Sequence, residues 1–146
     1  MALRLVVPVF VVAVMVDLLS KVWATSHAGL LVYHHTPSEL PRRVVMSLVA
    51  IGVATLLARA ATLRGLGRLW GVWIGCALLV AGVLSNGVSA LLWSRGVPDF
   101  IDVGDGWIWN VADFEIGIGM TGGILSVAFT ALAVYAREKR ATARVR

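Results

Sequence analysis

Long apolar stretches alternate with short polar segments along the chain. Four of these stretches, residues 5–23, 44–61, 69–93 and 116–136, approach the ~20 residues that a helix needs to cross the hydrocarbon core of a bilayer. The first is longer than the apolar core of a signal peptide, and Asp17 and Lys21 interrupt its end, so we expect it to stay uncleaved. The pattern predicts an all-α integral membrane protein with four transmembrane helices, in one domain over residues 1–146.

Composition agrees with this class, because 59% of the residues are hydrophobic and only 14% are charged, against about 25% charged in soluble domains. The net charge is +5, but the basic residues flank the apolar stretches, where membrane orientation explains them, so no nucleic-acid partner is expected. The single cysteine, Cys76, excludes an intramolecular disulfide and a cysteine-based metal site. The histidines of the first outer loop, His27, His34 and His35, are interpreted as interfacial loop residues, and no metal or cofactor is expected.

The distribution of basic residues predicts the orientation. Residues 59–68 carry three arginines and no acid, and residues 137–146 carry five basic residues against one glutamate. Lysine and arginine concentrate on the cytoplasmic side of membrane proteins, so both segments, and with four spans both termini, are expected in the cytoplasm. Arg42 and Arg43 oppose this arrangement at the outer end of the second stretch, but the larger bias prevails.

Two aspartates in the last outer loop are the best candidates for chemistry. Asp99 and Asp113 lie just outside apolar stretches, where a carboxylate is costly unless it has a function. Two carboxylates that share one proton can hydrolyse a peptide bond without a nucleophilic side chain. Asn110 could cap the last helix and fix the direction of Asp113. The residues alone leave two readings open, a paired catalytic site and an acidic solvated loop, the latter being the reading for Asp102 and Asp105.

Three more polar side chains lie within the apolar stretches. Asp17 and Lys21 are four residues apart, so on a helix they share a face and can neutralise each other. They form either a structural ion pair or a support that orients a site. Asn86 lies toward the outer half of the third stretch, where its amide needs a partner and could bind a neighbouring helix or belong to a site.

In these residues the chain resembles the lipoprotein signal peptidases (signal peptidase II), a family of four-span aspartic peptidases. The matching segments are residues 17–21 (Asp-Leu-Leu-Ser-Lys), Asn86, residues 95–102 (Arg-Gly-Val-Pro-Asp-Phe-Ile-Asp) and residues 109–113 (Trp-Asn-Val-Ala-Asp). An Asn-x-Ala-Asp box combined with an upstream Val-x-Asp-Phe box is a specific pattern, whereas either box alone would be weak. The resemblance implies these roles: a catalytic dyad of Asp99 and Asp113, polar site residues Asn86 and Asn110, and a supporting pair of Asp17 and Lys21.

The resemblance also implies a substrate and a place. The substrate would be a diacylglyceryl-modified prolipoprotein, cleaved at the outer face of a bacterial cell membrane, with membrane lipids around the enzyme. Two close carboxylates do not both ionise cheaply. The ionised aspartate would therefore take a proton from the attacking water, and the neutral one would donate to the scissile carbonyl.

The chain departs from the family pattern at several positions. The family has glycine before the asparagine of the third span and an Asp-Arg pair three and four residues after it, where this chain has Ser85, Ser89 and Ala90. The substrate-holding stretch of the first outer loop is replaced by residues 33–38 (Tyr-His-His-Thr-Pro-Ser). Arg95 could stand in for the missing arginine, although its position is not equivalent.

These departures keep a second hypothesis open, a catalytically silent relative that binds lipidated peptides or a partner membrane protein. The retention of both aspartate boxes favours the enzyme. A small transporter with an acidic gate is a weaker reading, because no broken helix with a matching half is visible in the sequence. The oligomeric state does not follow from the sequence.

Overall fold

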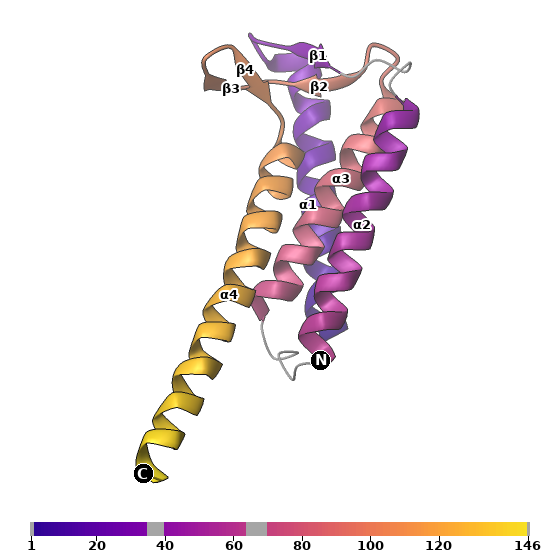
Figure 1. Cartoon of the computed structure of the whole chain (residues 1–146). Coiled ribbons are helices and arrows are strands. Elements are labelled where there is room, and N and C mark those ends of the chain that lie inside the picture. The colour runs from indigo at the N-terminus through magenta and orange to yellow at the C-terminus, as the bar shows by residue number, and fades with distance from the viewer. Residues whose placement is uncertain (1, 35–39, 64–69, 146) are drawn as a thin grey trace.

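The computed structural model describes residues 2–34, 40–63 and 70–145, and most of them are helical (Figure 1). The helices are α1 (Ala2–His27), α2 (Leu40–Leu63), α3 (Trp70–Leu92) and α4 (Val111–Val145). Helix α3 packs against each of the other three, most extensively against α4. It therefore forms the centre of the bundle, and the polar residues that it carries are enclosed by its neighbours.

Three helices of the described part of the chain are long and apolar enough to cross a membrane. Their candidate spans are Arg4–His27, Trp70–Leu92 and Val111–Ala136. In α2 the apolar stretch is shorter, Val44–Leu56, because arginines flank it on both sides. The structure thus supports a mostly helical membrane protein, and the second expected span, residues 44–61, is helical but has the shortest apolar section.

Helices α3 and α4 approach each other so closely that their backbones touch. A Cβ atom added at Gly119 would lie 2.5 Å from the backbone nitrogen of Leu79, and one at Gly75 would lie 2.7 Å from the Gly119 carbonyl oxygen. A Cβ atom at Gly82 would lie 2.5 Å from the Ala112 carbonyl oxygen. Small residues allow such contacts between membrane helices. They bring the N-terminus of α4 against the polar face of α3.

Within the described residues, four short strands add to the helices that the sequence predicts. Strand β1 (Val32–His34) pairs antiparallel with β2 (Val97–Asp99), and β3 (Ile101–Gly104) pairs antiparallel with β4 (Trp107–Trp109). The β3–β4 turn runs through Asp105, whose φ of 52° is left-handed and is a conformation that aspartate tolerates better than most residues. The strands lie together at one end of the bundle, and both chain termini lie toward the other (Figure 1).

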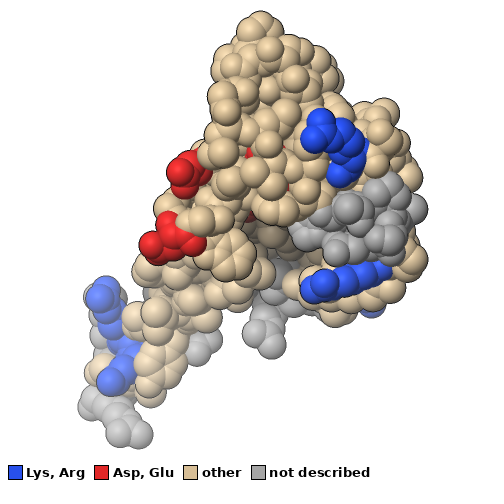
Figure 2. Space-filling view, turned by 90° about the horizontal axis from the view of Figure 1, so that it is seen from above, with Lys and Arg blue, Asp and Glu red and all other residues tan. Residues whose placement is uncertain are grey.

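The strand end of the molecule is mainly uncharged when viewed from above (Figure 2). Asp102 and Asp105 of the β3–β4 hairpin are exposed, as expected for solvated loop carboxylates. By contrast Asp17, Lys21 and Asp99 are buried, with exposed fractions of 0%, 0% and 4%. A buried polar cluster therefore lies where the helices meet the strands.

Candidate active site

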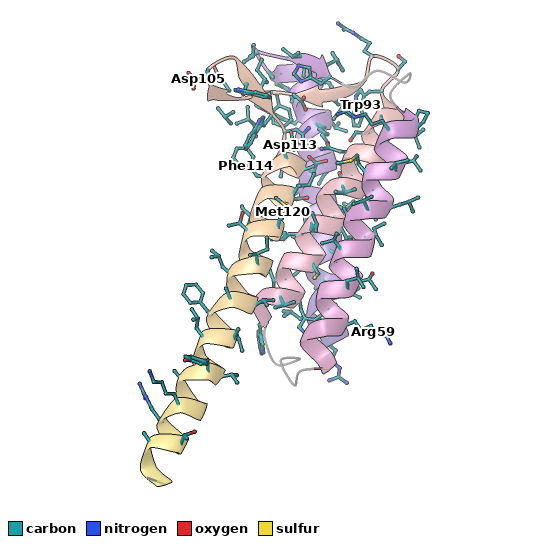
Figure 3. All side chains as sticks on the ribbon, viewed as in Figure 1. Arg59, Trp93, Asp105, Asp113, Phe114 and Met120 are labelled. Carbon is teal, nitrogen blue, oxygen red and sulfur yellow. The ribbon has the colours of Figure 1, made fainter. Side chains whose placement is uncertain are left out.

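The candidate site begins at the first turn of α4. In Figure 3 Asp113 lies there, directly below the strands, while Asp105 lies at the tip of the hairpin. Asn110 precedes the helix, and its side-chain oxygen accepts from the Asp113 backbone N–H (3.3 Å) while the Asp113 carboxylate accepts from the Asn110 backbone N–H (3.0 Å). This reciprocal arrangement is a capping box. It fixes both side chains before any tertiary contact is considered.

Asn110 also binds the second aspartate. Because its side-chain oxygen faces the Asp113 backbone N–H, its amide nitrogen faces the other way and donates to Oδ1 of Asp99 at 2.5 Å. Asp99 ends β2, and Phe100 after it is held to β4 by a backbone hydrogen bond to Trp109 (3.0 Å). The structure therefore brings Asp99 and Asp113 to one residue, Asn110, from two different elements.

A second asparagine holds Asp113 from the side of α3. The side-chain amide of Asn86 donates to Oδ1 of Asp113 at 3.0 Å, and its oxygen accepts from Nζ of Lys21 at 2.8 Å. An ammonium group only donates hydrogen bonds, so Lys21 determines which end of the Asn86 amide faces Asp113. Lys21 thus orients Asn86, and Asn86 in turn holds Asp113.

Asp17 balances the charge of Lys21 and anchors α4. Its Oδ2 lies 2.7 Å from Nζ of Lys21 and also accepts from the Ser85 hydroxyl, while its Oδ1 accepts from the Ala112 backbone N–H at 2.8 Å. Ser89 accepts from Lys21 at 3.0 Å. A buried ion pair needs such additional hydrogen bonds to offset its desolvation. Ser85 and Ser89, which depart from the family pattern, are both part of this network.

His34 contacts Asp99, which the sequence pattern does not predict. Its Nδ1 lies 2.6 Å from Oδ2 of Asp99, and its side chain is 48% exposed. The register of β1 and β2 pairs Val32 with Asp99 and His34 with Val97, so His34 and Asp99 are diagonal neighbours on one face of the ribbon. Neither the three-residue strand β1 nor its pairing with β2 can be predicted from the sequence pattern.

Arg95 lies elsewhere. Its guanidinium carbon is 4.4 Å from the centre of the Tyr33 ring, and Tyr33 faces away from His34 because side chains alternate along a strand. This cation–π contact ties β1 to the turn between α3 and β2. Arg95 therefore stabilises the packing of β1 against this turn and does not lie beside the two aspartates.

Two apolar grooves flank α4 near the site. One, of about 470 Å³, runs down α4 from Trp109 and Phe114 to Leu125. The other, of about 380 Å³, is lined by Pro8, Val12 and other α1 residues together with Glu115. Glu115 is 7% exposed, and its Oε2 has no hydrogen-bond partner among the described residues.

The arrangement can activate water. Each oxygen of Asp99 and Asp113 has one hydrogen-bond contact within the described chain. A carboxylate offers about four lone-pair positions, so both side chains are held and both keep positions for water or a carbonyl group. No group of three or more histidine, cysteine, aspartate or glutamate side chains suited to a metal ion occurs within the described residues.

Comparisons with known proteins identify no family for this chain, because no protein-family model, no curated protein and no solved structure matches it.

Proposed function

We propose that this chain is a membrane aspartic endopeptidase of the lipoprotein signal peptidase type. Its substrates are diacylglyceryl-modified prolipoproteins, cleaved at the outer face of a bacterial cell membrane that the chain crosses four times with both termini in the cytoplasm. The observation that carries the proposal is the link through Asn110, which binds Asp99 with its side chain and Asp113 with its backbone. Aspartic hydrolysis requires two close carboxylates that share a proton, and Asn110 holds the buried Asp99 and the half-buried Asp113 on one residue.

The chemistry follows from the arrangement of the dyad. One aspartate is ionised and takes a proton from water as the water attacks the scissile carbonyl. The other carries the proton that the pair shares and donates it to the carbonyl oxygen. When the tetrahedral intermediate collapses, the first aspartate donates its proton to the leaving amine, and the other aspartate takes back a proton from the hydroxyl formed on the carbonyl oxygen, which restores the shared proton. Asn86 and Asn110 keep both carboxylates in place during these transfers, since each asparagine amide is itself oriented by a donor.

The buried hydrogen-bond network of Asp17, Lys21, Ser85, Asn86 and Ser89 favours an enzyme over a silent relative. Where the family pattern has an acidic residue after the asparagine of the third span, Ser89 still accepts a hydrogen bond from Lys21. Ser85 donates to Asp17. The two hydrogen bonds that connect Lys21 to Asn86 and Asn86 to Asp113 are therefore present without the family's Asp-Arg pair. A relative that had lost catalysis would have no need to keep this buried network, which costs desolvation energy.

The grooves beside α4 suit a substrate that enters from the lipid. The groove below Trp109 and Phe114 is apolar and begins next to Asp113 in the sequence. An acyl chain or an apolar signal helix would lie there with its polar end at the level of the dyad. Because lipid is as apolar as the groove, close packing against the groove and polar contacts at the level of the dyad, and not transfer from water, would hold such a substrate near the site.

The proposal is tested with purified protein in vesicles that contain a lipidated prolipoprotein. We expect conversion to the shorter mature lipoprotein together with release of the signal peptide, and no conversion in vesicles without the protein. The silent-relative hypothesis predicts instead that the parent protein binds the prolipoprotein without cleaving it. Binding without cleavage at any enzyme concentration would therefore favour that second function.

A further inference from the structure

His34 is placed beside Asp99 by the pairing of two strands. It ends β1, and its partner Val97 is two residues from Asp99 along β2. A slip of one residue would turn His34 to the opposite face, where Tyr33 now lies under Arg95. The cation–π contact between Tyr33 and Arg95 therefore helps to hold the register that keeps Nδ1 of His34 at 2.6 Å from Oδ2 of Asp99.

The two oxygens of Asp99 have different kinds of partner. Oδ1 accepts from the amide nitrogen of Asn110, whose orientation is set by the capping box. Oδ2 faces an imidazole nitrogen, which can donate or accept according to the tautomer. If Nδ1 carries the proton, Asp99 accepts at both oxygens, and hydrogen bonds to a carboxylate favour its ionised form. The tautomer of His34 thus decides whether Oδ2 of Asp99 accepts or donates in this contact.

The partners of Asp113 differ from those of Asp99. Its two oxygens accept from the Asn86 side chain and from the Asn110 backbone, which are both neutral amides. His34 can carry a positive charge, and a hydrogen bond from a charged donor is roughly twice as strong as one between neutral groups. Among the hydrogen-bond partners of the two carboxylates in the described residues, His34 is the one that can carry a charge, and it faces Asp99.

We propose that His34 is a positioning residue of the dyad, which donates its Nδ1 proton to Oδ2 of Asp99 and keeps that carboxylate ionised. Asp99 is then the base that takes the proton from water, and Asp113 carries the shared proton. This inference rests on the proposed function, because it assigns the two roles within that mechanism.

The kinetic test compares substitutions at His34 with a matched control at His27. His34→Ala removes the donor and is expected to lower kcat by about 10–100-fold, the loss typical of a hydrogen bond to a charged group, with KM within about threefold because the substrate is not contacted. His34→Asn places an amide nitrogen where Nδ1 was and should restore most of kcat. His27 stacks on Trp23 at the end of α1, so His27→Ala should cleave at the parent rate.

Chemical rescue separates positioning from a structural role. His34 is half exposed, so added imidazole should reach the gap left in His34→Ala and raise its kcat, whereas it should do nothing for Asp99→Asn. A structural defect would not respond to imidazole. Absence of rescue, or cleavage by His34→Ala at the parent rate, would overturn the inference while leaving the proposed function intact. No cleavage by the parent would overturn the proposed function and the role of His34 with it.

The direction of the hydrogen bond has its own test. Nitrogen-15 NMR of the histidine-labelled parent in detergent distinguishes a protonated Nδ1 from a bare one, and comparison with His34→Asn assigns the signals. We expect a protonated Nδ1 at the pH of the cleavage assay and a shift of that signal in Asp99→Asn. An Nδ1 without a proton would mean that Asp99 is the donor, and would reverse the two roles.

Discussion

The ammonium group of Lys21 lies 2.8 Å from the side-chain oxygen of Asn86. Since lysine has no acceptor, this contact turns the amide nitrogen of Asn86 toward Asp113, 3.0 Å away. A residue of the first helix thereby sets the geometry of a carboxylate on the last helix. The supporting pair of Asp17 and Lys21 acts through Asn86 and needs no direct contact with the dyad.

Removal of the lysine should cost both stability and cleavage. Lys21→Met leaves the buried Asp17 charge unpaired and should lower the free energy of unfolding by about 3–5 kcal/mol. The double variant Lys21→Met/Asp17→Asn removes that charge as well and should recover most of the loss. Cleavage should stay low in both, because neither orients Asn86. Unfolding in detergent and the vesicle assay measure the two effects, and full cleavage by the double variant would contradict the relay from Lys21 to Asp113.

Asn110 has two tasks that one substitution can separate. Asn110→Ser keeps a side-chain oxygen that caps α4, so its loss of stability should be limited to about 1–3 kcal/mol, the cost of leaving the buried Asp99 oxygen without its donor. It removes the amide nitrogen that binds Asp99, so cleavage should fall by about 10–100-fold. Asn110→Ala, which loses the cap as well, should be less stable than Asn110→Ser by about 1 kcal/mol. Parent-level cleavage by Asn110→Ser would show that the bridge to Asp99 is dispensable.

The contact between α3 and α4 is tested by two glycines of α4. Gly119→Ala places a Cβ atom 2.5 Å from the Leu79 nitrogen, and overpacking of this kind costs about 1–3 kcal/mol. Gly117→Ala meets nothing within 4 Å and serves as the control. The melting temperature in detergent should fall for Gly119→Ala and stay unchanged or rise for Gly117→Ala. Equal melting temperatures would mean that the two helices are not in backbone contact.

Orientation in the membrane can be tested with reporter fusions. Fusions after Arg68 and after Arg146 should report a cytoplasmic location, because both follow arginine-rich segments. A fusion at residues 104–106, in the turn between β3 and β4, should report the outer side. A cytoplasmic hairpin would place the dyad in the wrong compartment for lipoprotein processing. The fusion after Arg68 also tests whether the second helix crosses the membrane, because its apolar stretch is only Val44–Leu56.

Much of the helical fold could be read from the sequence, because the length and polarity of each apolar stretch are local properties. The cap at Asn110 was also local, since a capping residue and its partner are three positions apart. The strands were missed because they have three or four residues each, too few for a pattern of alternation to stand out.

The network of the site depends on contacts that are distant in sequence. Lys21 and Ser89 are 68 residues apart, and His34 and Asp99 are 65 apart. Periodicity along one helix or strand gives no information on such partners. His34 was therefore interpreted as an interfacial loop residue, and Arg95 was considered as a site residue although it braces Tyr33.

The most direct test of the account is cleavage of a lipidated prolipoprotein by Asp99→Asn and Asp113→Asn, measured beside the parent and the exposed control Asp102→Asn. Asparagine keeps the size of the side chain and removes its ionisation, so both variants should insert and accumulate. Each should lose cleavage by at least about 10²–10⁴-fold, and the double variant should be no worse, because residues that act as a unit fail together. Asp102→Asn should remain within a few-fold of the parent. Parent-level cleavage by either dyad variant would contradict the aspartic mechanism.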